Sequence, residues 1–270
     1  MRISCLIDNR AEAGFRAEHG LSLWIEANGK KLLFDAGSSG AFAENAMKLG
    51  IDLSEADAAV LSHGHYDHSG GMERFFELNG KARLYVRAGA LREHWSLSTG
   101  SKRYIGLSEK LKESDRLVEL DADAELWPGF LLFGAGDEHE LVSEANLVLL
   151  GPDGKTRDDF GHEQNLIICE NGKTALIAGC AHRGIVNILS RCIQLNGSAP
   201  DVVVGGFHLA IPGTDGVDEP LANAVASRLL EHPGTTYYTG HCTGDGPFRL
   251  LSARMKQALH GFAAGDVIEL

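Results

Sequence analysis

Three histidines and one aspartate fall within six residues, directly after a short apolar run at residues 58–61. They are His63, His65, Asp67 and His68. Imidazole and carboxylate groups are ligands for zinc, iron and manganese in proteins. In an extended loop, the i and i+2 positions put His63 and His65 on one side of the chain, and Asp67 and His68 follow at the turn. A polar surface loop does not account for this density of ligand-type residues, so the segment predicts a metal centre at the end of a buried strand.

Short apolar runs of strand character alternate with longer amphipathic stretches along the chain. We predict strands at residues 3–7, 21–27, 31–34, 58–61, 82–86, 146–150, 166–169, 175–177, 201–204 and 235–238. We predict helices at residues 40–49, 71–77, 184–195, 221–232 and 250–260. Asn-Gly pairs at 28–29 and 171–172 are strong signals for tight hairpin turns. The order predicts an α/β fold in which two sheets stack face to face with helices outside, as one four-layer αββα domain over residues 1–270.

Residues 89–128 have weak periodicity and mixed polarity. Segments of this kind tend to lie over a site and shape its access. We therefore expect an insertion that acts as a lid. Within it, His94 stands beside Trp95 and is the histidine with the best claim to a role outside the motifs.

Composition excludes several classes of protein. The longest apolar runs are far shorter than the ~20 residues that cross a bilayer, so we expect no membrane partner. The net charge is −12 without a Lys/Arg cluster, which argues against nucleic acid as a partner. Five cysteines at irregular spacing are typical of a reducing cytoplasm rather than of a disulfide framework. We therefore expect a small molecule as the substrate. The sequence leaves open whether the chain forms a homo-oligomer.

The motif of His63, His65, Asp67 and His68 resembles the His-x-His-x-Asp-His signature of the metallo-β-lactamase superfamily. The resemblance implies an αββα sandwich with one or two metal ions between the sheet edges. It assigns the first two histidines to metal one and the Asp-His pair to metal two. Phe-Asp-Ala-Gly at residues 34–37 is similar to a family turn whose acid, here Asp35, supports the histidine loop from behind.

The resemblance also points to ligands from later loops. Cys180 stands where many family members have a bridging aspartate, and a thiolate is a competent ligand for borderline metals. His182, two residues on, would coordinate metal or bind substrate. His241 matches the histidine of the last family motif, which binds metal two. His162 is the candidate for the third histidine of metal one, with Glu163 as an alternative ligand.

Three further segments narrow the resemblance to one branch of the superfamily. They are Gly-Cys-Ala-His-Arg-Gly-Ile-Val-Asn at 179–187, Gly-Gly-Phe-His-Leu at 205–209 and Gly-His-Cys-Thr-Gly at 240–244. They look like the branch of 7,8-dihydropterin-6-yl-methyl-4-(β-D-ribofuranosyl)aminobenzene 5′-phosphate synthase. His208, in the second segment, is placed as a general acid or substrate contact, and a histidine that merely ends a strand is the equal alternative.

Together these residues imply a metal-dependent hydrolase. The implied ligand set is His63, His65 and His162 for metal one, Asp67, His68 and His241 for metal two, and Cys180 near both. The cofactors would be two divalent ions, zinc first, with iron or manganese as alternatives. Asp67 would also orient the attacking hydroxide, and His208 or His182 would protonate the leaving group. Candidate substrates are phosphodiesters and small phosphorylated compounds, ahead of lactones and thioesters.

Two other functions stay open. The first is the condensation that the synthase branch performs, which needs aromatic stacking for a pterin; Trp95, Tyr104 or Trp127 would supply it. The second is a non-hydrolytic di-iron sensor. Di-iron members of the superfamily generally carry an acid at the position of His65, so this histidine argues against the sensor.

Overall fold

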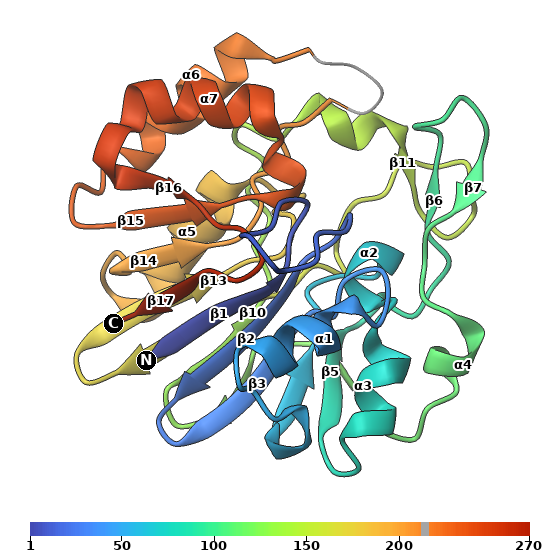
Figure 1. The fold of residues 1–270 in the computed structure, drawn as a ribbon. Helices are drawn as coiled ribbons and strands as arrows, with labels where there is room; N and C mark the ends of the chain where they lie inside the picture. The colour runs from blue at the N-terminus through green and yellow to red at the C-terminus, as the bar shows by residue number, and fades with distance from the viewer. Residues whose placement is uncertain (212–215) are drawn as a thin grey trace.

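Two seven-stranded sheets pack face to face in the computed structural model, which describes residues 1–211 and 216–270 (Figure 1). In order across the first sheet, the strands are β17 (Val267–Glu269), β1 (Arg2–Ile7), β2 (Ser22–Ala27), β3 (Lys30–Phe34), β4 (Ala58–Val60), β5 (Arg83–Arg87) and β8 (Leu117–Leu120). The strands from β17 to β3 pair antiparallel, and those from β3 to β8 pair parallel.

The second sheet repeats this plan. In order across it, the strands are β16 (Leu259–Gly261), β15 (Thr236–Thr239), β14 (Val202–Val204), β13 (Lys173–Ile177), β12 (Asn165–Glu170), β10 (Phe130–Phe133) and β9 (Ala124–Trp127). The strands from β16 to β13 are parallel, and those from β13 to β9 are antiparallel. Each half of the chain therefore joins an antiparallel meander to a set of parallel strands.

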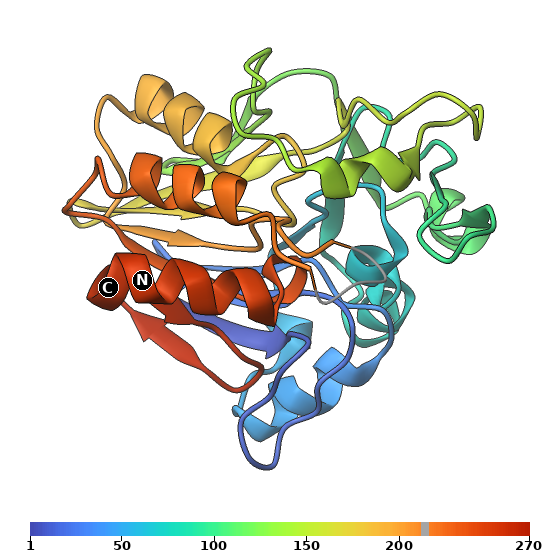
Figure 2. The same ribbon diagram turned by 90° about the horizontal axis from the view of Figure 1, so that it is seen from above.

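Helices cover the outer face of each sheet (Figure 1). They are α1 (Ala41–Lys48), α2 (Tyr66–Ser69), α3 (Met72–Leu78), α4 (Glu109–Lys112), α5 (Ile185–Asn196), α6 (Glu219–Leu229) and α7 (Asp245–Met255), with short 3-10 turns at η1 (Leu53–Glu55), η2 (Glu144–Val148), η3 (His241–Thr243) and η4 (Lys256–Ala258). Figure 2 shows α5, α6 and α7, yellow-orange to red, side by side over the second sheet. The predicted αββα layers are confirmed. No helix in the described residues has the length and hydropathy to cross a membrane.

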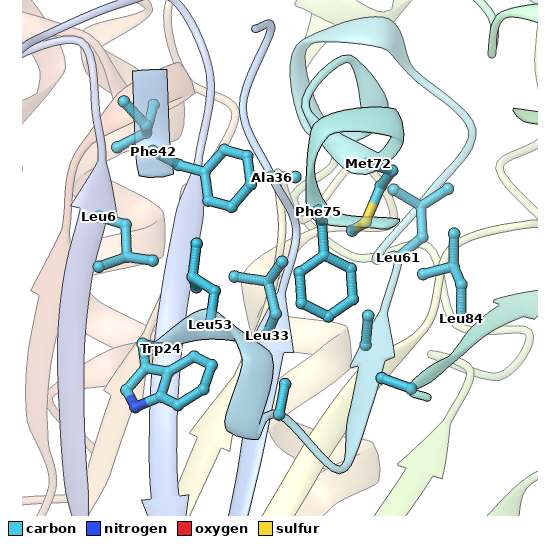
Figure 3. Close-up of a cluster of buried hydrophobic side chains, with 14 of the residues drawn as sticks. Leu6, Trp24, Leu33, Ala36, Phe42, Leu53, Leu61, Met72, Phe75 and Leu84 are labelled. Atoms are coloured by element: carbon cyan, nitrogen blue, oxygen red, sulfur yellow. The ribbon is translucent and has the colours of Figure 1, made fainter. Parts of the chain in front are cut away.

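Alternation along the strands separates the inner core from the outer ones. In β3, Leu32 and Phe34 face the opposite sheet, and Leu33 faces the helices. The same alternation holds in β12, β13 and β14, as the period of two in a strand requires. Under α1 and α3, Phe42 and Phe75 are fully buried against the first sheet (Figure 3). These apolar layers fix the strand ends from which the polar loops emerge.

Both predicted Asn-Gly hairpin turns are confirmed. The φ angles are 48° and 68° at Asn28 and Gly29, and 51° and 77° at Asn171 and Gly172. Two residues with positive φ make the turn whose twist matches the flanking strands, which suits Asn and Gly. The first turn joins β2 to β3 and the second joins β12 to β13.

The predicted strand at residues 146–150 is wrong over most of its length. Residues Glu144–Val148 form η2, and only Leu149–Leu150 (β11) are extended. The hydroxyl of Ser143 accepts a hydrogen bond from the backbone N–H two residues on, at 3.1 Å. A local cap of this kind favours a turn over a strand, and it overrides the apolar run that suggested one.

The predicted helix at residues 250–260 is displaced toward the N-terminus. In the structure α7 occupies Asp245–Met255, and Leu259–Gly261 is the edge strand β16. The break comes at Lys256, whose φ of 52° is left-handed. A residue in that conformation ends a helix, and the sequence gives no glycine there to announce it.

The segment of residues 89–128 divides between two locations. Its first part forms β6 (Trp95–Ser96) and β7 (Arg103–Tyr104), and β6 pairs with both β7 and β11 in a small third sheet beside the main body (Figure 1). Its last part supplies β8 and β9, the edge strands of the two large sheets. The role of this segment as a lid stays a prediction.

Candidate metal centre

Ligand-type side chains gather at one edge of the molecule, where strands of both sheets end. The carboxyl ends of parallel strands meet at one sheet edge, where loops collect functional side chains. The contributing strands and residues are β3 with Asp35, β4 with His63, His65, Asp67 and His68, β13 with Cys180 and His182, β14 with His208, and β15 with His241. The two sheets therefore supply one site together.

The motif loop is held close to its surroundings at Gly64. A Cβ at this position would lie 2.5 Å from the carbonyl oxygen of Ala90 and 2.6 Å from Nε2 of His94. Only glycine fits there. α2 begins directly after the loop, and its first turn carries Asp67 and His68, both buried. The close approach at Gly64 and the start of α2 set the directions of the four motif side chains.

A first group of ring nitrogens comes from His63, His65 and His182. Nε2 of His63 lies 3.0 Å from Nδ1 of His65 and 3.2 Å from Nε2 of His182. All three side chains are buried. Tetrahedral ligands at ~2.0–2.1 Å from a zinc ion are roughly 3.3 Å apart, so the spacing suits three ligands of one cation.

A second group contains His68, His241, Asp67 and Cys180. Nε2 of His68 lies 3.2 Å from Nε2 of His241 and 3.2 Å from Sγ of Cys180. Oδ2 of Asp67 lies 3.4 Å from Nε2 of His241 and 3.8 Å from Nε2 of His68. The four atoms can surround a second cation, and they include every residue that the sequence predicted for it.

Cys180 links the two groups. Its sulfur lies within 4.8 Å of ligand atoms of both His63 and His68. Burial and the neighbouring Cys242 raise the pKa of the Cys180 thiol well above its usual value. A cation beside a thiol stabilises the thiolate, so ligation is the condition under which this buried sulfur would carry charge.

The outer nitrogens of four rings are each occupied by an oxygen partner. The contacts are Ser62 Oγ to His63 Nδ1 at 2.9 Å, Asp35 Oδ2 to His68 Nδ1 at 2.6 Å, Asn146 Oδ1 to His182 Nδ1 at 2.9 Å and Asn9 Oδ1 to His241 Nδ1 at 2.9 Å. A ring that donates its outer N–H presents a lone pair at the inner nitrogen. This is the arrangement that metal-binding histidines adopt.

The pKa shifts of the histidines differ in direction: burial alone would lower the pKa of His68, but the contact with Asp35 raises it. Burial is the largest cause that lowers the pKa values of His63, His65 and His182 well below the usual range. Neutral imidazole is the form that binds metal. Burial alone would raise the pKa of Asp67, but the neighbouring rings of His19 and His241 hold it well below its usual value. Three neutral rings and one carboxylate therefore face the centre.

Asp35 supports the motif loop as expected from the sequence. Its carboxylate accepts hydrogen bonds from the backbone N–H and the hydroxyl of Ser62, both at 2.7 Å, and from His68. Asp35 is fully buried and has a left-handed φ of 57°. One carboxylate thus fixes the start of the loop and orients the ring of His68.

His162 lies outside the first group of ring nitrogens. The sequence predicts His162 as the third histidine of that group, and in the structure His182 lies there instead. Nδ1 of His162 accepts a hydrogen bond from Gly64 N at 3.1 Å, and its Nε2 lies 3.2 Å from Oδ2 of Asp158. The same Asp158 oxygen lies 2.9 Å from Nδ1 of His94. Because Nδ1 accepts, Nε2 carries the proton, so this network braces Gly64 from behind.

Glu163 also supports the site from behind. Its two oxygens accept hydrogen bonds from the backbone N–H groups of His182, at 2.7 Å, and Arg183, at 2.9 Å. Burial raises the pKa of Glu163 to about 7. The buried carboxyl group therefore holds the loop that carries His182, and it is partly protonated at neutral pH.

We expect this raised pKa to appear in the pH dependence of stability. The unfolded chain releases the proton near pH ~4.3 and the folded chain near 7. The contribution of Glu163 is therefore full below pH ~4 and is lost as the pH rises to 7. In metal-free protein, the free energy of unfolding of the wild type relative to Glu163→Gln should fall by roughly 3 kcal/mol between pH 4.5 and 8. Urea unfolding at several pH values measures this, and parallel profiles for the two proteins would contradict it.

His208 lies at the edge of the first group. Its ring centroid is 4.0 Å from that of His182, and its φ of 49° is left-handed. Neither ring nitrogen is hydrogen-bonded within the described residues, although both are buried. Burial would raise the pKa of the Cys242 thiol, but Cys180 and the ring of His208 hold it well below its usual value, so the ring lies against Cys242.

Three polar residues at the centre were not singled out from the sequence. His19, whose side chain is 60% exposed, has Nε2 3.3 Å from Oδ2 of Asp67. Asn9 and Asn146 are the partners of His241 and His182 described above. Asn9 and His19 come from irregular segments and Asn146 from η2, and no periodicity or spacing distinguishes the three.

A pocket of about 280 Å³ opens over the two groups. Its floor includes His65, Asp67, Cys180, His182 and His241. Its walls are mostly apolar and include Tyr66, Ile105, Ala145 and Leu149, with Ser96, Ser98 and Arg103 from the third sheet. A small molecule with an apolar body would reach the two groups of ligand-type side chains from this side.

The fold and the site define the class of protein. A model of the metallo-β-lactamase superfamily matches residues 16–241, and the chain belongs to this family. Its members typically bind divalent metals and are often metal-dependent hydrolases. The clustered His, Asp and Cys side chains agree with that membership, and relatives with hydrolase activity support an enzyme.

Particular relatives are similar over the whole chain. An uncharacterized protein of Methanocaldococcus jannaschii is 31% identical over 98% of this chain and 97% of its own. The 7,8-dihydropterin-6-methyl-4-(β-D-ribofuranosyl)-aminobenzene-5′-phosphate synthase of the same organism is 27% identical over 94% of this chain and 91% of its own. The structure of Tm1679, a metal-dependent hydrolase of the β-lactamase superfamily, superposes with a TM-score of 0.81 at 29% identity, over 100% of this chain and 99% of the other.

Proposed function

We propose that this protein is a hydrolase that uses two divalent cations to activate water against a small, phosphorylated ester. The ligands of the first cation are His63, His65 and His182, and those of the second are Asp67, His68 and His241, with Cys180 between them. His182 replaces His162 in the set that the sequence suggested. The proposal differs from that set in this one position.

One observation carries the proposal. The inner nitrogens of five imidazoles lie in two groups with nitrogen–nitrogen contacts of 3.0–3.2 Å, while the outer nitrogens of four of them are occupied by oxygen partners. His63 and His182 each have an oxygen partner at Nδ1, so their Nε2 atoms, 3.2 Å apart, face each other with lone pairs that repel. A cation between them removes the repulsion, so the donor set fits a bound metal.

A pair of divalent cations lowers the pKa of a bound water and stabilises charge on the substrate oxygen. The residues of this chain would orient the nucleophile and protonate the leaving group. Asp67 holds a fixed negative charge beside His241 and is placed to accept a hydrogen bond from the nucleophile. His208, whose ring nitrogens are unoccupied in the described structure, is the candidate donor of a proton to the leaving group. The third-sheet part of residues 89–128 would act as the lid over the pocket.

The test is metal analysis of freshly purified wild type and His63→Ala, with a bis(p-nitrophenyl) phosphate assay of the same samples. We expect about two transition-metal ions per chain, and a loss of both metal and turnover in the variant. The sulfur of Cys180 favours zinc or iron over magnesium or calcium, so zinc should restore the stripped enzyme. No bound metal, or activation by magnesium alone, would overturn the proposal.

The second candidate is a condensation like that of the synthase, favoured by 27% identity over nearly the full chain. Metal without hydrolysis in the assay above would support it. Trp95, Tyr104 and Trp127 are absent from the pocket lining, and Tyr66 is the aromatic residue there. Trp95 packs on Tyr104 and Trp127 packs on Phe130, so pterin stacking would fall to Tyr66. Two iron ions without hydrolysis would instead indicate the sensor.

A further inference from the structure

Arg103 is the one lysine or arginine among the described residues that line the pocket. The chain carries a net charge of −12, so carboxylates are plentiful on its surface. Nevertheless the side chain of Arg103 forms no hydrogen bond or ion pair within the described residues. An unneutralised guanidinium at the mouth of a reactive site is available to a ligand.

The strand register turns this side chain to the pocket side. In the β6–β7 hairpin, Ser96 pairs with Arg103 and Trp95 pairs with Tyr104. Side chains of directly paired residues share one face of a sheet, and the next pair faces the other way. Ser96 and Arg103 both line the pocket, whereas Trp95 and Tyr104 do not. The hydroxyl of Ser96 donates to Ser98 Oγ at 2.9 Å, which places a second polar group of the pocket lining beside Ser96.

Three contacts tie this end of the pocket to the loop that carries the motif histidines. The guanidinium carbon of Arg103 lies 5.5 Å from the ring centroid of Tyr66, a cation–π distance. Tyr66 N donates to the carbonyl oxygen of Ile105 at 2.8 Å, and Ile105 N donates to that of His94 at 2.8 Å. Tyr66 follows His65 directly in the chain. The position of Arg103 is therefore fixed relative to the motif loop.

We propose that Arg103, together with the hydroxyl of Ser98 that Ser96 orients, binds an oxyanion of the substrate remote from the bond that is cut. Guanidinium groups bind carboxylate and phosphate through paired charge-assisted hydrogen bonds. The wall between the two ends includes Ile105, Ala145 and Leu149, which suits a carbon body. The substrate class is thus a small organic molecule with a reacting ester at one end and a carboxylate or phosphate at the other. This assignment rests on the proposed function for the reacting end.

Glutarate and pentanoate are the probes for this subsite. They have the same five-carbon chain, and only glutarate carries a second carboxylate. Calorimetry on the zinc-loaded protein should show glutarate binding about tenfold tighter or better, the factor expected of one charge-assisted hydrogen bond. Arg103→Gln should remove that preference and leave pentanoate unchanged, and Arg103→Lys should keep part of it. The preference should also weaken in high salt.

Lys102→Gln is the matched control, because it removes the same charge from the neighbouring residue. Lys102 lies over the ring of Trp95 at 4.8 Å and does not line the pocket. The Lys102→Gln variant should bind glutarate and pentanoate as the wild type does. Equal or undetectable binding of the two acids by the wild type would overturn the subsite, as would an unchanged preference in Arg103→Gln. These outcomes are separate from hydrolysis, because binding is measured without turnover.

A kinetic experiment tests phosphate as the oxyanion. It compares the hydrolysis of thymidine 5′-(p-nitrophenyl phosphate) with and without a 3′-phosphate. A kcat/KM advantage for the 3′-phosphorylated compound that Arg103→Gln removes would support phosphate as the oxyanion. An advantage that persists in Arg103→Gln would overturn Arg103 as its ligand. Failure of wild type to hydrolyse either compound would count against the proposed hydrolase, while the acid-binding result would still decide the subsite.

Discussion

Asp67→Ala is expected to lower kcat by about a thousandfold or more and to reduce bound metal from two ions to one. Asp67 supplies the carboxylate of the second group, 3.4 Å from Nε2 of His241. Without it, that group keeps two imidazole rings and a thiol whose pKa burial raises. Two imidazoles and a sulfur hold a dication more weakly than the same set with a carboxylate.

The measurement is metal content and turnover of the variant beside Asp115→Ala, an exposed aspartate that serves as the control. Asp67 also accepts a backbone hydrogen bond from Leu21 N through its carbonyl oxygen. That bond survives the substitution, so the loop should remain folded, and circular dichroism will show it. Retention of two ions and of full activity in Asp67→Ala would remove this residue from the centre.

Asp35→Ala is expected to destabilise the metal-free protein by about 3–5 kcal/mol. The substitution leaves the Ser62 N–H, the Ser62 hydroxyl and Nδ1 of His68 without their acceptor in a fully buried place. The ring of His68 also loses the contact that orients it, so binding of the second metal ion should weaken by tenfold or more.

Asp35→Asn is the matched variant, because the carboxamide keeps the shape and one acceptor oxygen. It should recover part of the stability and little of the metal binding. Urea unfolding after metal removal separates the structural effect from the ligand effect. A loss below 1 kcal/mol in Asp35→Ala would show that the loop is held mainly by other contacts.

The sequence predicted most of the large elements, and it predicted that several ligand-type residues at strand ends would lie together. His63, His65, Asp67 and His68 share one loop, so their proximity follows from local geometry alone. Cys180 and His241 each follow an apolar strand, and adjacent parallel strands end at one edge. The αββα layers were predictable for a related reason, because period-two runs and amphipathic stretches alternate along the chain.

The choice between His162 and His182 was not predictable in this way. Both follow the motif loop by about a hundred residues and both reach the same edge of the molecule. Which ring faces inward depends on left-handed residues in the loops, Phe160 with φ 54° and Ala181 with φ 58°. Neither residue type favours that conformation, so tertiary contacts decide it. The contacts of His19 and Asn9 also depend on tertiary structure, so the sequence did not predict them.

Part of the pocket wall and the ligand-type residues belong to different sheets. The ligand-type residues stand on loops of the two large sheets, whereas Ser96, Arg103 and Leu149 stand on β6, β7 and β11. Insertions or substitutions in this small hairpin can change which molecules enter without moving a ligand. A lineage with this architecture can diversify its substrates by remodelling one short surface segment while its reaction stays constant.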